Sequence, residues 1–287
     1  MSMVEQIIQA SNKLPPFSMV IQKALQLIED PKSSAQQVVE VIQYDQSITF
    51  KVLKVCNSAY FGLKRKVSSL KEALIMIGFD QLLQIVLSQE SSKIFLKDCS
   101  GYDLHHGDLW RHSVSCALLS KIICNHVHEI RSNAIFTAAL LHDIGKMVLH
   151  SYVRNYFAEI KLLTEEKALS FSEAEKAILG IDHAELGGMI MEKWSFPEEI
   201  IFAVRYHHTP LSTSNYSQVI DLVYLSDLIA MMTGIGGGAD ALNYHGYEEV
   251  IKRHAFKEDD LEHFMVQLSD QLGLIEEMLQ GHPNLGR

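Results

Sequence analysis

The feature that most constrains the fold of this chain is an ordered set of histidines and aspartates spread over residues 112 to 227. At its centre, His142-Asp143-Ile144-Gly145 directly follows an apolar stretch, Ala134 to Leu141. The other members are His112 upstream, and His183, His207, His208 and Asp227 downstream. The intervals are 30, 40, 24 and 19 residues (112 to 142, 143 to 183, 183 to 207, 208 to 227), each long enough to leave one helix and return on another. The set therefore predicts side chains that project from several helices into the interior of one bundle.

Short sequence signals along the whole chain predict helices. Four segments resemble capping boxes that precede apolar, helix-periodic stretches: Ser34 to Gln37, Ser69 to Glu72, Ser172 to Glu175 and Asp182 to Glu185. The alternating pattern that is typical of strands is missing. We therefore expect an all-α chain.

The distribution of histidine divides the chain near residue 100. All 14 histidines lie after that point, whereas residues 1–100 are rich in valine, isoleucine and leucine. We expect an N-terminal helical subdomain over 1–100 and a second one, with the histidines and the C-terminal helices, over 101–287. The first can supply packing and surface, but no imidazole ligand.

Composition limits the class of partner and the compartment. The net charge of −10 argues against broad binding of nucleic acid. The four cysteines form no CxxC pair, as expected in a reducing cytosol. Two of them, Cys116 and Cys124, are predicted to be small buried hydrophobic residues. No signal peptide is evident, and no apolar run approaches the ~18 residues of a membrane span. We expect a cytoplasmic protein with no membrane partner.

Several motifs resemble those of HDOD-domain proteins. In the N-terminal half they are Leu14-Pro-Pro-Phe17, Gln43-Tyr-Asp-Gln-Ser47, Val55-Cys-Asn-Ser-Ala-Tyr-Phe-Gly62, Ser68-Ser-Leu-Lys-Glu-Ala73 and Ile77-Gly78. In the second half they are Ala139-Leu-Leu-His-Asp-Ile-Gly-Lys146, His183-Ala-Glu-Leu-Gly187, Trp194-Ser-Phe-Pro197 and Tyr206-His-His-Thr-Pro210. The resemblance covers about residues 14–232. It implies an all-helical fold in which an N-terminal subdomain packs on an HD-type phosphohydrolase-like core, as in bacterial signalling proteins.

The resemblance to active HD and HD-GYP hydrolases also implies a ligand set for two divalent ions. His112, His142, Asp143 and Asp227 match the ligands of the first ion, and Asp143 bridges to a second ion held by His183, His207 and His208. Asp108 matches an extra carboxylate ligand, and Lys146 matches a lysine that faces phosphate. The resemblance thus implies that Lys146 and Asp143 are the catalytic residues. These donors suit iron, manganese, nickel or zinc alike. The alternative is a set of core histidines that only form hydrogen bonds, but a buried aspartate without a cation or donor would be costly.

Two functions follow from the resemblance. The first is a regulatory module of bacterial signal transduction with a retained binuclear metal site, whose partner is a signalling protein or a small phosphorylated ligand. The alternative is a metal-dependent phosphohydrolase that acts on a nucleotide or phosphodiester. The Gly-Tyr-Pro loop of the HD-GYP enzymes is missing, since the chain reads His207-His-Thr-Pro-Leu-Ser212. Hydrolysis of cyclic di-GMP is therefore not expected.

Three further side chains carry predictions about packing and surface. Asn57 is expected to fix its loop through buried hydrogen bonds, and Tyr60 and Phe61 are expected to pack on the core. His126 is expected to be exposed, and so is His128.

Overall fold

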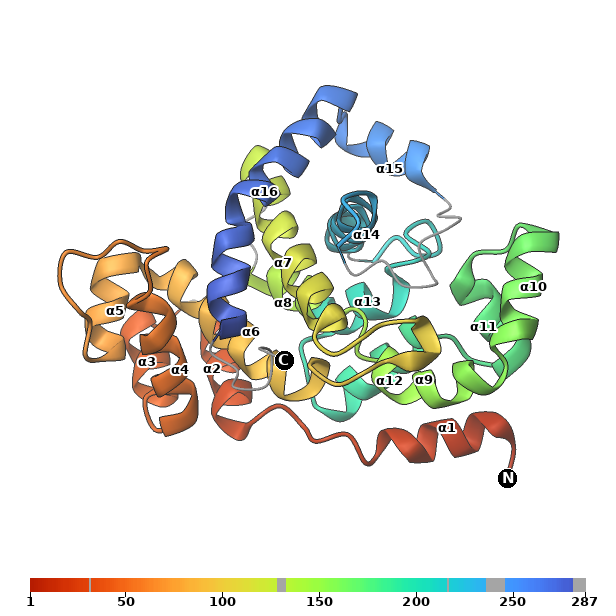
Figure 1. Ribbon diagram of the computed structural model, residues 1–287, viewed down its shortest axis with the longest axis horizontal. Coiled ribbons are helices and arrows are strands. Elements are labelled where there is room, and N and C mark those ends of the chain that lie inside the picture. The colour runs from red at the N-terminus through yellow and green to blue at the C-terminus, as the bar shows by residue number, and fades with distance from the viewer. Residues whose placement is uncertain (31, 128–132, 216, 236–245, 281–287) are drawn as a thin grey trace. The chain divides into compact units, whose positions relative to one another are not determined.

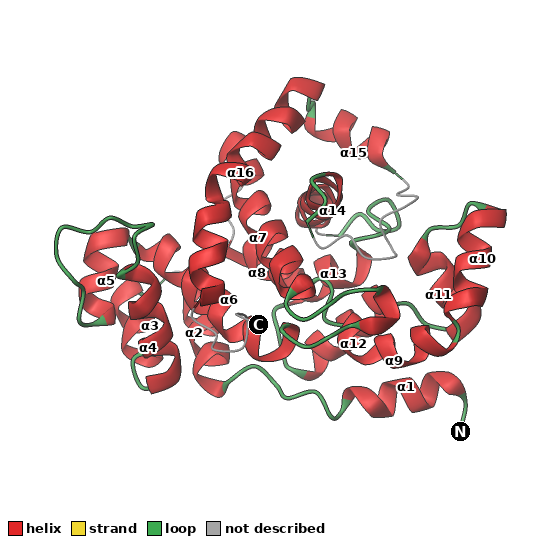
Figure 2. Cartoon of the chain, viewed as in Figure 1, coloured by secondary structure: helices red, strands yellow, loops and turns green. Residues whose placement is uncertain are grey.

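The computed structural model describes residues 1–30, 32–127, 133–215, 217–235 and 246–280, and these residues form helices joined by loops (Figures 1 and 2). Within these ranges there is no strand, and one isolated bridge joins Cys99 and Leu104. The expected all-α class is confirmed. No helix of the described chain has the length and apolar character that crossing a membrane requires. His128 lies outside the described residues.

The chain divides into two compact units. The first comprises Met1–Pro15 and Ile94–Asp270, and it holds every residue of the predicted site. Its helices are α1 (Met3–Ser11), the 3-10 helix η1 (Ser100–Tyr102), α7 (Asp108–Val127), α8 (Asn133–Leu141), α9 (Lys146–Asn155), α10 (Phe157–Lys167), α11 (Phe171–Leu179), α12 (His183–Lys193), α13 (Glu198–Tyr206), α14 (Ser217–Met232), α15 (Tyr247–His254) and the first part of α16 (Glu258–Gln280).

The second unit comprises Pro16–Lys93 and the chain from Gln271 onward. Its helices are α2 (Met19–Glu29), α3 (Ala35–Ile42), α4 (Gln46–Cys56), α5 (Leu70–Ile77), most of α6 (Phe79–Phe95) and the end of α16. The predicted division near residue 100 stays a prediction, although this grouping puts α1 in the unit that carries the histidines.

The capping signals place most of the predicted helix starts correctly. Ser34 accepts a hydrogen bond from the backbone N–H of Gln37, whose side chain accepts one from Ser34 in return. Ser69 caps α5, and Asp182 caps α12. The predicted box at 172–175 is wrong, because Ser170 with Glu173 caps α11 two residues earlier. Glu175 therefore lies inside the helix, where it is buried.

Helix α14 forms the centre of the first unit and is seen end-on in Figure 1. It contacts α7, α8, α13 and α15. Leu222, Val223 and Leu225 are fully buried, as expected for a helix that is apolar on several sides. Its buried Asp221 accepts hydrogen bonds from Arg253 (2.7 and 2.9 Å) and lies 3.0 Å from His254 Nε2, both on the α15 side. The second aspartate of α14, Asp227, belongs to the predicted site.

In the second unit, Asn57 holds the turn after α4. Its amide donates to the carbonyl of Val67 (2.8 Å) and accepts from the Val67 N–H (2.7 Å), so the predicted hydrogen bonds of Asn57 are present, although they are only partly buried. The prediction for Tyr60 is wrong, since its side chain is 41 % exposed. Tyr60 packs edge-on against Phe61, with ring centroids 5.1 Å apart, rather than entering the core.

Candidate metal centre

The loop between α8 and α9 presents Asp143 to the interior of the first unit. Short turns hold this loop: Ile144 N donates to Leu141 O and Lys146 N donates to Asp143 O, both at 3.0 Å. Gly145 allows the loop to touch the start of α12, because a Cβ there would lie 2.0 Å from the carbonyl oxygen of His183. The absence of a side chain at Gly145 thus brings Asp143 next to His183.

Five other side chains of the predicted set come from the helices around this loop. His112 lies on α7 and Asp227 on α14, while His183 is the first residue of α12. His207 follows the last residue of α13, and His208 comes next. Of these, all but the partly buried His208 are at most 2 % exposed. The structure therefore gathers the ordered set at one buried point, as its spacing implies.

Asp143 lies between two groups of histidines. Its Oδ2 atom is 3.8 Å from His112 Nε2 and 3.4 Å from His142 Nε2. Its Oδ1 atom is 3.5 Å from His183 Nε2 and 3.9 Å from His207 Nε2. One carboxylate thus presents one oxygen to each group, the arrangement of a bridging ligand.

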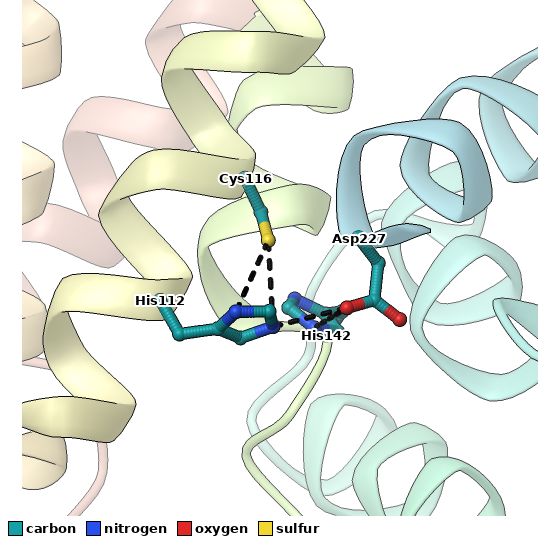
Figure 3. Close-up of side chains that lie close together, drawn as sticks. All are labelled: His112, Cys116, His142 and Asp227. Carbon is teal, nitrogen blue, oxygen red and sulfur yellow. Dashed lines mark hydrogen bonds and ion pairs between the residues drawn. The ribbon is translucent and has the colours of Figure 1, made fainter. Parts of the chain in front are cut away.

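Each group contains further donors. In the first, Asp227 Oδ1 is 3.0 Å from His112 Nε2 and 3.6 Å from His142 Nε2. Figure 3 draws these three side chains together with Cys116. In the second, His183 Nε2 and His208 Nε2 are 2.8 Å apart. Nitrogen and oxygen donors at such separations are those that a divalent transition metal takes.

The Nδ1 atoms of four histidines are held by oxygen acceptors. Because a carbonyl or carboxylate can only accept, each Nδ1 carries the proton and each Nε2 is left as a ligand atom. The acceptors are Ile235 O for His112 (3.0 Å), Ala139 O for His142 (2.7 Å), Glu175 Oε2 for His183 (2.7 Å) and Val204 O for His207 (2.7 Å).

Three buried atoms at this point have no hydrogen-bond partner among the described residues: His142 Nε2, Asp143 Oδ1 and His207 Nε2. A buried polar atom left unsatisfied costs roughly 1–3 kcal/mol. His142 Nε2 lies in the first group, and Asp143 Oδ1 and His207 Nε2 face the second, so a cation at each group would satisfy all three. The residues therefore fit divalent metal, and a purely hydrogen-bonded core does not account for these atoms.

The pKa values at the site reflect the same arrangement. Burial, followed by the neighbouring His142 and His183, lowers the pKa of His207 to about 3. Burial opposes ionisation of Asp143, but the charges of His142 and Lys146 hold its pKa well below the usual value. Burial also opposes protonation of His142, yet the Asp143 carboxylate raises its pKa to about 10. A neutral imidazole and an ionised carboxylate are the forms that bind metal. The raised pKa of His142 means that the Asp143 carboxylate stabilises a positive charge placed beside it.

Lys146 and Asp108 differ in how the structure places them. Lys146 is 3 % exposed and donates from Nζ to Asp143 Oδ2 at 2.7 Å, so it meets the bridging carboxylate directly. Asp108 lies in the first turn of α7, where its Oδ2 accepts a hydrogen bond from the backbone N–H of His105 (2.9 Å). None of the donor groups formed by the described residues includes Asp108, and its role as a ligand stays a prediction.

Glu175 and Tyr102, which contact the site, were missed from the sequence. Glu175 is fully buried and accepts from both the backbone N–H (3.0 Å) and Nδ1 of His183. Tyr102, from η1, donates to the other carboxylate oxygen of Glu175. In the sequence, Ser170 and Glu173 form a competing capping pattern two residues upstream. That pattern could have indicated that Glu175 does not cap the helix and can face inward.

We expect Glu175→Gln to weaken metal binding about 10-fold and Glu175→Ala about 100-fold, because carboxylates that orient ligating histidines contribute on this scale. The measurement is competition for metal against a chelator of known affinity. Glu166→Gln, at an exposed glutamate of α10, is the control. Equal affinity of the Glu175 and Glu166 variants would show that Glu175 does not position His183.

A pocket of about 250 Å³ lies beside the second group and is lined by one of its donors, His208. Its charged lining residues include Lys176 and Arg205, which pair with Glu185 (2.9 Å) and Glu192 (3.0 Å). The remaining lining residues are Ser172, Glu173, Asp182, Ala184, Glu185, Tyr206 and Thr209. The pocket offers a ligand access to His208, whereas the other donors are buried and do not line it.

Comparison with solved structures finds the same fold. An HDOD domain protein of unknown function from Geobacter sulfurreducens is 22 % identical, with a TM-score of 0.72 over 98 % of each chain. A protein from Shewanella amazonensis SB2B, provisionally named a phosphohydrolase, is 20 % identical, with a TM-score of 0.68 over 96 % of this chain and 97 % of that one. A protein from Marinobacter aquaeolei VT8, provisionally named a signal transduction protein, is 18 % identical, with a TM-score of 0.71 over 97 % of this chain and 65 % of that one.

Comparison of sequences agrees with the comparison of structures. An uncharacterised protein of Treponema pallidum (strain Nichols) is 22 % identical over 218 residues, which are 75 % of this chain. The match spans 41 % of the length of the Treponema protein. The pattern of the HDOD domain family matches residues 14–210. The chain therefore belongs to the HDOD domain family.

Proposed function

We propose that this protein is a regulatory module of bacterial signal transduction that binds two divalent metal ions. The observation that carries the proposal is the convergence of His142 Nε2, Asp143 Oδ1 and His207 Nε2, three buried atoms for which the described residues supply no hydrogen-bond partner. The module would respond to a signalling protein or to a small phosphorylated ligand.

Each ion has a donor set on the chain. His112, His142 and Asp227 would hold one, His183, His207 and His208 the other, and Asp143 would touch both. When bound, such ions supply positive charge and Lewis acidity to a phosphoryl oxygen. The role of the chain itself is to orient its ligands, chiefly through the hydrogen bond between Glu175 and His183. The chain also holds the Lys146 ammonium at 2.7 Å from Asp143.

Burial of the donors favours the regulatory function over catalysis. His112, His142, Asp143, His183 and His207 are at most 1 % exposed. Lys146, the residue expected to face phosphate, is hydrogen-bonded to Asp143 and is not among the residues that line the pocket at His208. A metal ion whose ligands are buried in this way is suited to stabilise one conformation of the protein or to respond to a change of conformation.

The pocket at His208 favours a second candidate function, a metal-dependent phosphohydrolase for a nucleotide or phosphodiester. Lys176 and Arg205 line this pocket, which borders the second group of donors. Both cations already have carboxylate partners, Glu185 and Glu192. A phosphorylated ligand would have to compete with these carboxylates, so we rank this function second.

The experiment that tests metal binding is elemental analysis of the protein purified without chelator. We expect two divalent ions per chain, because the two donor groups share only Asp143 and each supplies three further ligands. Protein that has been stripped with a strong chelator and reloaded with manganese, iron or zinc serves as the reference for full occupancy. A correctly folded protein with no metal above background, before and after reloading, would refute the proposal.

We expect the metal-loaded protein to show no efficient hydrolysis of cyclic di-GMP. The loop that accompanies this activity in HD-GYP enzymes is missing after His208, and misplacement of a substrate by an ångström costs orders of magnitude in rate. Slow turnover of bis-p-nitrophenyl phosphate is compatible with the second candidate function. Assays on both substrates, with Asp143→Asn as the inactive reference, separate these cases. Rapid turnover of cyclic di-GMP that depends on Asp143 would make the protein an enzyme.

A further inference from the structure

We propose that Cys116 supplies a thiolate ligand to the ion held by His112, His142 and Asp227, so that sulfur closes this site. The inference rests on the proposed metal binding and adds a residue to it. Cys116, expected from the sequence to be a small buried hydrophobe, is indeed fully buried. Its surroundings are nevertheless those of a ligand.

The position of Cys116 on α7 brings its sulfur to the donor group. Cys116 follows His112 by four residues, so both side chains leave the same face of the helix. In Figure 3 they point toward the space that His142 and Asp227 reach from the other side. The Sγ atom lies 3.5 Å from His112 Nε2, and the four donor atoms all lie within 4.8 Å of one another.

These separations are close to those of a bound ion. In a tetrahedral zinc site, nitrogen at about 2.0 Å and sulfur at about 2.3 Å from the ion lie about 3.5 Å from each other. The donors of Cys116, His112, His142 and Asp227 therefore need to contract by at most about 1.5 Å on any edge to reach this geometry. Rotation of a cysteine side chain and small shifts of the rings accomplish such a change.

A comparison within the same helix shows that burial alone does not explain Cys116. Cys124 is also buried on α7, two turns further on, but it belongs to none of the donor groups formed by the described residues. At Cys116, by contrast, the fully buried His142 Nε2 faces the same space and has no hydrogen-bond partner in the described chain. An ion there would satisfy His142 and replace the thiol proton, which leaves to solvent.

The proposal distinguishes the two ions by their chemistry. Sulfur favours zinc and other thiophilic ions over manganese and magnesium. Because Asp143 counts for both ions, Cys116 would give the first ion five protein donors, whereas the second would have four, to which a further ligand can add. The first ion would then stabilise the bundle, and the ion of the His183, His207 and His208 group, beside the pocket, would be the one that a ligand reaches.

The test is titration of the full-length, metal-stripped protein with cobalt(II), followed by near-ultraviolet absorption and by elemental analysis. We expect a thiolate-to-cobalt charge-transfer band in the wild type, its loss in Cys116→Ser, and its retention in Cys124→Ser. The Cys116→Ser variant should also lose zinc affinity to a greater extent than manganese affinity. X-ray absorption of the zinc-loaded wild type, which needs no variant, should show a sulfur neighbour at about 2.3 Å.

The outcomes separate this proposal from the proposed metal binding. Cobalt bound without a charge-transfer band, or zinc with nitrogen and oxygen neighbours alone, would overturn the role of Cys116 while metal binding stands. A band that persists in Cys116→Ser would assign the sulfur to another cysteine and would overturn it as well. Absence of any bound cobalt or zinc in the folded wild type would overturn both. If Cys116→Ser fails to fold, loss of the band in Cys124→Ser would still contradict the proposal.

Discussion

Replacement of Asp143 by alanine is expected to remove both ions and to lower the melting temperature by roughly 10 °C. Asp143 is the carboxylate whose two oxygens face the two groups of donors, at 3.4 Å from His142 and 3.5 Å from His183. It is also the 2.7 Å partner of the buried ammonium of Lys146. Removal of one member of a buried ion pair costs about 3–5 kcal/mol, which corresponds to a shift of roughly this size in a domain of this length.

The measurements are metal content by elemental analysis and thermal unfolding followed by circular dichroism. Asp98→Ala replaces an exposed aspartate of the same unit and controls for the chemistry of the substitution. His126→Ala removes a histidine whose side chain is 43 % exposed and which lies 3.5 Å from Asp260, so a small effect is expected. Equal losses of metal in the Asp143 and Asp98 variants would mean that the ligand assignment is incorrect.

Replacement of Gly145 by alanine is expected to destabilise the protein by about 2–3 kcal/mol, a typical effect of overpacking against a rigid neighbour. Gly145 has an ordinary helical backbone conformation, so the cost is steric. The new Cβ would lie 2.0 Å from the carbonyl oxygen and 2.8 Å from the carbonyl carbon of His183, neither of which can rotate away. The loop of Asp143 must then separate from the start of α12, and the His183 group should lose its ion first.

Chemical denaturation and metal content test this prediction together. The matched control is Gly273→Ala, because the Cβ there would meet only side-chain atoms of Tyr60, at 3.4 Å or more. Gly273 lies within α16, where alanine is favoured over glycine by about 1 kcal/mol. We expect opposite signs for the two substitutions. A Gly145 variant as stable and as rich in metal as the wild type would show that contact between the loop and α12 is not required for the site.

The helices and many of their ends were predictable because the signals that start a helix act over three or four residues. Ser34, Ser69 and Asp182 each accept a hydrogen bond from the N–H three residues later, as their sequence patterns indicate. The error at 172–175 arose where two such patterns overlap. Ser170 with Glu173 and Ser172 with Glu175 are both acceptable locally, and burial of Glu175 against His183 favours the first.

The residues of the buried cluster were likewise visible in the order of His112, His142, Asp143, His183 and Asp227. Their spacing required several helices to meet, and an interior that collects five such groups has few uses other than to bind a cation. The sequence could not show how Asp143 divides its oxygens between two groups, since that depends on the contact of Gly145 with His183 across the bundle.

What the sequence by itself determined is thus the helical class and most helix starts, because each depends on residue type and on spacing within one segment; the His and Asp residues that it singled out as donors stay a prediction. Only the tertiary structure showed that Glu175, Tyr102 and Cys116 lie at the candidate site. Their side chains are ordinary in their own helices, and what sets them apart is what lies opposite: the Nδ1 of His183 for Glu175, and the donors of His112, His142 and Asp227 for Cys116. Contacts between segments far apart in the chain follow from packing, and no local pattern encodes them.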